Sequence, residues 1–224
     1  MGRASDEYVH ALGYGWLNRL YDPLIRISMR EETFKRRLLG YATIAPGHHV
    51  LDLGCGTATL TILTKRLHPQ AEVIGLDGDP KILEIAAGKI ARAGLDITLD
   101  CGMSFDLPYP EGSFDRVLSS LMLHHLTRAD KVRTLLEVFR VLRPGGELHI
   151  ADWGKPAGTA ARAAAWLVGK LDGADRLEDN LKGWLPTLLE ETGFTGARQA
   201  GQFATILGTL GFYCGAKPGS KAGT

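Results

Sequence analysis

The chain has 224 residues, and its 26 lysines and arginines against 25 aspartates and glutamates give a formal net charge of +1, which excludes a global field that would attract nucleic acid. A hydrophobic content of 45% and a charged content of 23% are ordinary for a globular chain, and no apolar run reaches the ~18 residues of a membrane span. Three cysteines without a Cys-x-x-Cys pair, and an N-terminus without a signal-peptide pattern, favour a reducing, cytoplasmic location without stable membrane insertion.

The segment 7–40 predicts one or two helices, because Leu12, Trp16 and Leu20 recur at the spacing of one helix face. We expect residues 1–46 to form a helical lid. Its aromatic side chains, Tyr21 among them, are candidates to roof a ligand, since aromatic rings attract cations. Ordinary helix packing is the alternative role for these rings.

Residues 47–153 predict an alternation of strands and helices. Strands are expected at 49–53, 72–77, 96–100, 114–119 and 146–152. One intervening helix has Asp79 as its N-cap, Pro80 at its first position and Gly94 just past its end. Alternating elements of this kind predict a parallel sheet with right-handed crossovers, which binds ligands beyond the carboxyl ends of its strands.

A second helix is expected after Thr127, with its apolar side chains buried and its end at Pro144. The side chains expected in the core are Val132, Leu135, Leu136 and Phe139.

Beyond the core, residues 154–216 predict a wall beside the ligand followed by a terminal hairpin. The expected elements are a helical insertion over 154–173, a helix over 181–192, and antiparallel strands over 195–202 and 208–216. Residues 217–224 are expected to be a disordered tail. We therefore expect one α/β domain over 1–216.

The segment around Gly54 and Gly56 carries the clearest functional signal. A buried strand runs into Gly54, which permits a tight turn, and Gly56 lets the backbone approach a ligand. Asp77 ends the next predicted strand, where an acid holds two ribose hydroxyls. The third glycine of a dinucleotide fingerprint is missing, and Asp52 would repel a phosphate but suits an ammonium or sulfonium. These features predict an adenosine-type cofactor other than a dinucleotide.

Four segments in this order resemble the motifs of class I S-adenosylmethionine (SAM) dependent methyltransferases: 51–56, 75–79, 102–115 and 142–146. The segment 21–24, Tyr-Asp-Pro-Leu, is similar to the small-molecule subgroup that includes the ubiquinone and menaquinone C-methyltransferases. The resemblance implies a Rossmann-like doubly wound sheet and SAM as cofactor. It also implies in-line transfer of a methyl group to a small organic acceptor.

The resemblance further implies a set of cofactor-binding residues along the strand ends. They are Asp52, Gly54, Cys55, Gly56, Asp77, Gly78, Met103, Ser104 and Ser119. Met103 replaces the acid that many relatives carry, so an amide N–H of Met103 or Ser104 is expected to meet the adenine ring. Asp106 is the alternative source of that acid, or a turn residue. Asp52 has the alternative role of capping the turn after its strand.

Three residues are candidate catalytic groups: His124, Asp152 and Tyr21. His124 follows the fourth predicted strand, and an imidazole titrates near neutral pH, as a general base must. The alternative is that His124 orders the loop at the cofactor. Asp152 follows the fifth strand and either orients an acceptor or caps the next helix. No acidic cluster follows the fourth strand, so no metal site is expected.

Two other functions stay open on the sequence alone. Without an obvious base, the chain could be a catalytically silent SAM-binding sensor or partner subunit. Basic residues within 19–37 beside apolar ones are compatible with a lipid methyltransferase at a membrane surface, although Glu31 and Glu32 weaken that reading. The acceptor atom, the acceptor molecule and the formation of a homodimer are left open.

Overall fold

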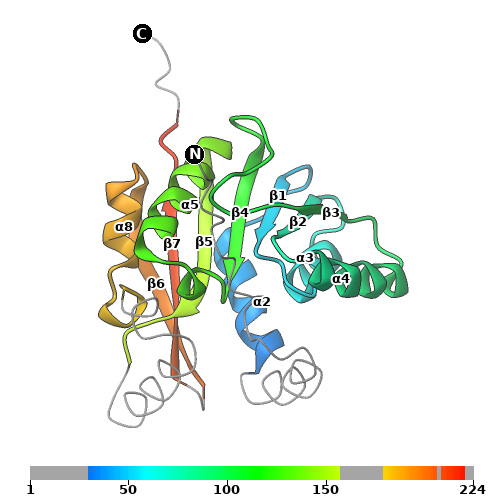
Figure 1. The fold of residues 1–224 in the computed structure, drawn as a ribbon, viewed down its shortest axis with the longest axis horizontal. Coiled ribbons are helices and arrows are strands. Elements are labelled where there is room, and N and C mark those ends of the chain that lie inside the picture. Colours follow the sequence, from blue (N-terminus) through cyan, green and yellow to red (C-terminus); the bar gives the residue numbers. More distant parts are fainter. Residues whose placement is uncertain (1–29, 157–178, 206–207, 220–224) are drawn as a thin grey trace, which may run out of the picture.

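The structure is a computed structural model, and it describes residues 30–156, 179–205 and 208–219 (Figure 1). Its centre is a seven-stranded sheet in the order β3-β2-β1-β4-β5-β7-β6. The strands are β1 (His49–Leu53), β2 (Glu72–Asp77), β3 (Thr98–Cys101), β4 (Phe114–Ser120), β5 (Leu142–Trp153), β6 (Thr195–Thr205) and β7 (Gly208–Ala216). Strands β1 to β5 pair in parallel, and β7 lies antiparallel between β5 and β6. The predicted fold class, a mostly parallel sheet with a C-terminal antiparallel hairpin, is confirmed.

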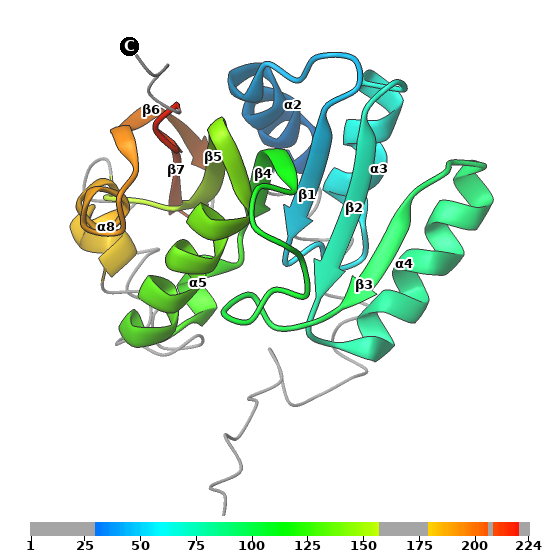
Figure 2. The same ribbon diagram turned by 90° about the horizontal axis from the view of Figure 1, so that it is seen from above.

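Helices cover both faces of this sheet (Figure 2). Their bounds are α2 (Glu31–Ala42), α3 (Thr59–Leu67), α4 (Pro80–Ala93), α5 (Arg128–Val141) and α8 (Leu185–Glu191), with a short 3₁₀ turn η1 (Leu123–His125). Alternate residues of β1 enter different clusters, Val50 packing with α2 and α3 and Leu51 packing with α5 and α8. Because a strand turns successive side chains to opposite faces, a run that is buried throughout belongs in the middle of such a layered fold.

The helix signals in the sequence correspond to real caps. The Asp79 carboxylate accepts a hydrogen bond from the N–H of Lys81, and Gly94 ends α4 in the left-handed conformation, with φ of 63°. Thr127 caps α5 by accepting from the N–H of Asp130. These caps depend on residue type at fixed positions, which is why the sequence predicts them.

The predicted start of the fifth strand and end of the preceding helix are wrong. Helix α5 ends at Val141 instead of Pro144, and β5 begins at once with Leu142 instead of residue 146. Gly145, with φ of 81°, donates its N–H to Lys217, so this stretch pairs with the chain after β7. The third strand is also displaced, to Thr98–Cys101 from the expected 96–100.

The buried face of α5 differs from the predicted one. Leu135 is buried as expected and Val132 and Phe139 are partly buried, but Leu136 is 51% exposed. The most buried stripe instead includes Lys131 and Thr134, together with Leu135, Val138 and Val141. The helix predicted over 181–192 is interrupted: residues 179–182 are helical, Gly183 breaks the helix with φ of 76°, and α8 starts at Leu185.

Helix α2 is part of the core. Phe34, Leu38 and Ala42 are at most 1% exposed and pack in the same cluster as Val50 and Leu118. This part of the expected lid therefore supports the sheet. The remainder of the lid with Tyr14, Trp16 and Tyr21, and the insertion expected over 154–173 apart from its first residues, lie outside the described residues. Within the described ranges, no helix combines the length and apolar character needed to cross a bilayer.

Candidate functional site

The loop after β1 is held against the end of β2 by its own backbone. Gly54 and Gly56 have φ of 70° and 53°, a conformation that favours glycine. The N–H groups of Gly54 and Cys55 both donate to the carbonyl of Leu76, at 2.8 and 2.9 Å. A side chain on Gly54 would collide with Met122 from the loop after β4, whereas the space beside Gly56 is open. The loop is thus tightly placed and leaves Gly56 accessible to a ligand.

Asp77 stands at the end of β2 beside this loop. Its Oδ2 accepts from the N–H of Gly56 at 2.9 Å, and its Oδ1 accepts from the N–H of Asp79 at 3.0 Å. A carboxylate has about four acceptor positions, so two bonds fix the group and each oxygen keeps capacity for another donor. This arrangement fits the two vicinal hydroxyls of a ribose. Gly78 follows Asp77 directly in the chain and precedes Asp79.

Asp52 is the most buried acid of the loop region, with 1% exposure. Thr61 of α3 donates its hydroxyl to Asp52 Oδ2 at 2.6 Å. Burial raises the pKa of Asp52 to about 6, although the Thr61 hydrogen bond and the charge of Lys35 oppose that shift. A cationic group of a ligand would restore the ionised form.

Cys55 is turned into the protein. Burial raises the pKa of its thiol well above the usual value, and the Sγ atom would be 3.0 Å from a Cβ placed on Gly75. Its N–H donates to the carbonyl of Leu76 and its carbonyl accepts from the N–H of Ala58 at 3.0 Å, so the backbone of Cys55 holds the loop in place.

The loop between β3 and β4 carries the two residues expected at the adenine. Met103 and Asp106 form an isolated bridge, in which the Asp106 N–H donates to the Met103 carbonyl, so Asp106 is an exposed turn residue. Ser104 Oγ lies 2.9 Å from the hydroxyl oxygen of Thr134 on α5. This hydrogen bond links the loop to α5. Because the hydroxyl of Ser104 is engaged there, its backbone N–H is the group that would contact a ligand.

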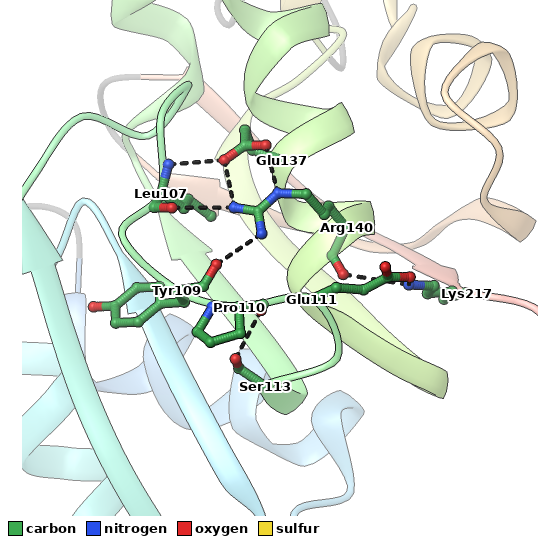
Figure 3. A network of polar contacts seen from close by, with 8 residues as sticks. All are labelled: Leu107, Tyr109, Pro110, Glu111, Ser113, Glu137, Arg140 and Lys217. Carbon is green, nitrogen blue, oxygen red and sulfur yellow. Dashed lines mark hydrogen bonds and ion pairs between the residues drawn. The ribbon is translucent and has the colours of Figure 1, made fainter.

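Arg140 of α5 anchors the rest of this loop (Figure 3). Its guanidinium donates to the carbonyls of Tyr109 at 2.7 Å and of Leu107 at 3.1 Å, and pairs with Glu137. Glu137 in turn accepts from the N–H of Leu107 at 2.8 Å. The hydrogen bonds of Glu137 to Arg140 hold the pKa of Glu137 below its usual value, so the carboxylate stays charged.

His124 and Asp152 meet at the ends of β4 and β5. His124 Nδ1 lies 2.7 Å from Asp152 Oδ1, and both side chains are at least 95% buried. Asp152 also accepts from the backbone N–H groups of His124 and Trp153. Burial opposes ionisation of Asp152, but the neighbouring His124 ring outweighs it and holds the pKa of Asp152 below its usual value.

Several buried polar groups at this end of the sheet have no hydrogen-bond partner among the described residues. They are the hydroxyls of Ser119, Ser120 and Tyr213 and the amide of Asn180. A buried polar atom without a partner is costly, so such a group calls for water or a ligand. Ser119 was expected to contact the cofactor, and it lies on the strand that leads into His124.

Sequence reasoning missed one charged cluster beside this pair. Lys131 is fully buried, and its Nζ lies 3.4 Å from Asp179 Oδ2, while Arg128 reaches Asp179 Oδ1 at 2.7 Å. Burial lowers the pKa of Lys131, although the charge of Asp179 opposes that shift. The available signal was the position of Lys131, three residues before Thr134 and four before Leu135, which places it on the buried face of α5. Across the described part of the chain, no three His, Cys, Asp or Glu side chains gather as a metal site.

Comparison with known proteins agrees with this geometry. A family model for a methyltransferase domain matches residues 50–146. A demethylmenaquinone methyltransferase of Symbiobacterium thermophilum is 35% identical over 157 residues, and the match spans 68% of this chain but only 61% of that relative. An uncharacterised methyltransferase of Synechocystis is 32% identical over 199 residues, covering 83% of this chain and 85% of the relative. The apo crystal structure of the SAM-dependent methyltransferase SibL superposes with a TM-score of 0.61 at 26% identity, over 77% of this chain and 51% of that one.

Proposed function

This chain belongs to the class I SAM-dependent methyltransferases, and from that premise we propose that it methylates a ring carbon of a small, hydroxylated aromatic acceptor of the quinol type. The demethylmenaquinone methyltransferase among its relatives supports a quinone-like acceptor. The buried acid–imidazole pair at the strand ends supports an acceptor that must lose a proton.

In this proposal the loop after β1 and the end of β2 bind the cofactor. Asp77 accepts from the two ribose hydroxyls, Gly56 and Gly78 allow the close approach, and Met103 and Ser104 line the adenine. Asp52 lies toward the amino-acid end, where a cationic ammonium favours its ionised form. When bound, SAM supplies an electrophilic methyl group on a sulfonium that is a good leaving group.

The observation that carries the proposal is the 2.7 Å contact between His124 and Asp152. A carboxylate can only accept, so Nδ1 of the ring carries the shared proton and Nε2 of the neutral ring is free to accept another. We propose that Nε2 takes the hydroxyl proton of the acceptor, and that the O–H electrons stay on the oxygen. The resulting phenolate raises the electron density of the neighbouring ring carbon.

The methyl group then passes from sulfur to the ring carbon in an in-line displacement. The new carbon–carbon bond forms from the ring electrons as the carbon–sulfur bond breaks, and the electron pair of that bond stays on sulfur. The ring carbon then releases its own proton to solvent, which restores the aromatic ring as the phenolate, and protonated His124 returns its proton to the phenolate oxygen. The protein contributes orientation, a dry site during methyl transfer, and the proton that His124 takes up and returns. The proposed place of Tyr21 over the acceptor rests on the sequence alone.

Methyl transfer can be tested with the full chain, SAM carrying a ¹³C-labelled methyl group, and a panel of naphthoquinols, catechols, amines and thiols. We expect the demethylated cofactor to form only with the quinol-type acceptors, with the ¹³C signal of a methyl group on a ring carbon. A methyl group found on nitrogen or oxygen would contradict the choice of acceptor atom. Tight binding of the demethylated cofactor without turnover on any acceptor would favour a silent SAM-binding protein.

A further inference from the structure

The side chain of Met122 lies on the loop after β1, between that loop and the turn that carries His124. Strands β1 and β4 are neighbours in the sheet, and their parallel pairing ends with Leu53 beside Ser119. Beyond these residues the two chains continue to Gly54 and Met122. A Cβ placed on Gly54 would lie 2.9 Å from Cβ of Met122 and 3.7 Å from its Sδ. Met122 therefore packs directly on the Gly54 backbone.

The backbone on both sides of Met122 fixes this position. Leu121 has φ of 56°, a left-handed conformation that costs energy for a residue other than glycine. Its N–H donates to the carbonyl of Ala151 at 2.8 Å, which holds the bend against β5. On the other side, the Met122 carbonyl accepts from the N–H of His125 at 3.0 Å and closes η1. The same bend thus places the Met122 side chain on the loop after β1 and begins the turn that contains His124.

The Met122 thioether combines access with a soft acceptor. Met122 is partly exposed, whereas Leu123 beside it is 1% exposed. The thioether sulfur of methionine is polarizable and a weak hydrogen-bond acceptor. The thiol of Cys55, in the loop that Met122 covers, is turned away toward Gly75.

The position of the cofactor sulfur follows from the proposed function, on which this step rests. The sulfonium of SAM joins the ribose to the amino-acid part, and these two parts are proposed to lie at Asp77 and Asp52. The sulfonium then lies along the loop after β1, between the two acids. Its methyl group must point from that loop toward the acceptor at His124. Met122 occupies this interval.

We propose that Met122 is a specificity-determining residue that contacts the sulfonium methyl group of SAM through Sδ and thereby favours SAM over S-adenosylhomocysteine. The positive charge of a sulfonium polarises the C–H groups of its methyl, which makes them weak donors. S-adenosylhomocysteine has neither this charge nor this methyl group. The contact is therefore lost when the methyl group leaves, and fresh SAM displaces the demethylated product more readily.

The test compares SAM and S-adenosylhomocysteine by calorimetry on the full chain without an acceptor, in the wild type and in Met122→Leu. Leucine keeps an apolar side chain on Gly54 but removes the sulfur. We expect the ratio of the two dissociation constants to shift about threefold against SAM, the worth of one weak contact to sulfur. Met103→Leu is the matched control. Met103 is proposed to line the adenine, which both molecules share, so its replacement should leave the ratio unchanged.

A second measurement uses the wild type, so that it does not depend on the folding of a variant. With ¹³C-labelled methionine methyl groups, the Met122 signal should differ clearly between the SAM and the S-adenosylhomocysteine complexes. The Met103 signal should be nearly the same in both, and the two leucine variants assign the signals.

An unchanged ratio in a folded Met122→Leu, or a Met122 signal that is the same in both complexes, would overturn the proposal. A wild-type chain that binds both molecules and gives either result fails this proposal without failing the proposed function. A wild-type chain that binds neither molecule would count against the proposed function itself.

Discussion

At the scale of single residues, Asp52 links the proposed cofactor site to pH. Its folded-state pKa of about 6 lies above the ordinary 3.8, so the ionised form is disfavoured in the folded protein without ligand. A bound ammonium would favour that ionised form. We predict that affinity for S-adenosylhomocysteine rises about tenfold between pH 5 and 7 and then levels off, because about a tenth of Asp52 is ionised one unit below its pKa. Calorimetry across this range measures the slope.

Asp52→Asn is the control for this linkage, because an amide has no proton to lose. Its affinity should be flat over the same range, and an equal slope in the variant would assign the pH dependence to another group. Stability gives an independent check. A raised folded-state pKa costs stability as pH rises from about 4 to 6, so Asp52→Asn should unfold at higher urea than the wild type at pH 8, and this difference should vanish near pH 4.

The second prediction at this scale concerns Asp152. Asp152→Asn would place an amide against Nδ1 of His124 and disturb both the tautomer and the orientation of the ring. If His124 is the base, turnover should fall by roughly 10²–10⁴-fold with little change in affinity for S-adenosylhomocysteine. The pH–rate profile should also lose the limb that the base contributes.

The exposed acid Glu84 supplies the control, since Glu84→Gln should change neither quantity. If His124 instead only orders the loop at the cofactor, affinity should fall while turnover at saturation persists in Asp152→Asn. Full turnover with an intact pH limb in a folded variant would remove the pair from catalysis.

At the scale of elements, α5 holds the loop between β3 and β4, which is proposed to line the adenine, through Arg140. Arg140→Lys would lose the planar fork that reaches Glu137, Leu107 and Tyr109 together. We predict that the free energy of unfolding falls by about 1–3 kcal/mol and that affinity for S-adenosylhomocysteine drops, because the loop with Met103 and Ser104 loses its anchor. Urea unfolding and calorimetry measure the two effects.

Arg36→Lys is the control, since Arg36 of α2 pairs locally with Glu32 through a largely exposed contact, whereas Arg133 of α5 stacks on Phe105 of the loop under test. The control variant should be close to the wild type in both measurements. If Arg140→Lys lowered stability and left the affinity intact, the loop would be supported by other contacts and would need no anchor on α5.

The helices and strands also show which sequence signals are sufficient to predict an element and which are not. Strands β1 and β2 and the caps of α4 and α5 follow from local pattern, because burial on both faces and capping chemistry are properties of a few adjacent residues. The start of β5 depends on the pairing of Leu142 with Phe114 of β4 and of Gly145 with Lys217, 72 positions away, and no local pattern contains either contact. Likewise, Leu136 fits a helical apolar stripe in the sequence, but the actual orientation of α5 buries Lys131 instead.

The candidate site likewise contains residues that the sequence predicts and contacts that only the fold brings about. Asp77 and Gly56 are recognised by spacing, and the structure joins them through one hydrogen bond. His124 and Asp152 were singled out separately, yet only the parallel pairing of β4 with β5 brings their rings and carboxylates together. The Lys131–Asp179 pair joins residues 48 positions apart across a segment without a recognisable motif, so sequence could not predict it.

At the scale of the whole molecule, the strand order places different groups of residues at the two ends of the sheet. The carboxyl ends of β1, β2, β4 and β5 lie at one edge, since these strands are parallel, and they carry the proposed cofactor and proton-transfer groups. The antiparallel β7 runs the other way and brings Cys214 and Ala216 to the opposite end, where they line a cavity with Glu147, His149 and Arg198. A parallel sheet with one reversed strand thus keeps this cavity apart from the proposed methyl-transfer site.

The N-terminal block contains two parts with different predicted roles. Burying Phe34, Leu38 and Leu39 of α2 is worth about 1.5–3 kcal/mol for each side chain, a sum close to the whole stability of a typical domain of about 5–15 kcal/mol. Removing residues 1–42 should therefore unfold the protein.

Removing only residues 1–29, which carry Tyr14, Trp16 and Tyr21, should leave the thermal transition and the affinity for S-adenosylhomocysteine nearly unchanged. If those aromatics cover the acceptor, turnover should fall, and Tyr21→Phe and Trp16→Phe in the full chain would separate a hydroxyl effect from a packing effect. Undiminished turnover in the shorter truncation would exclude the lid, and a folded protein lacking residues 1–42 would exclude the structural role of α2.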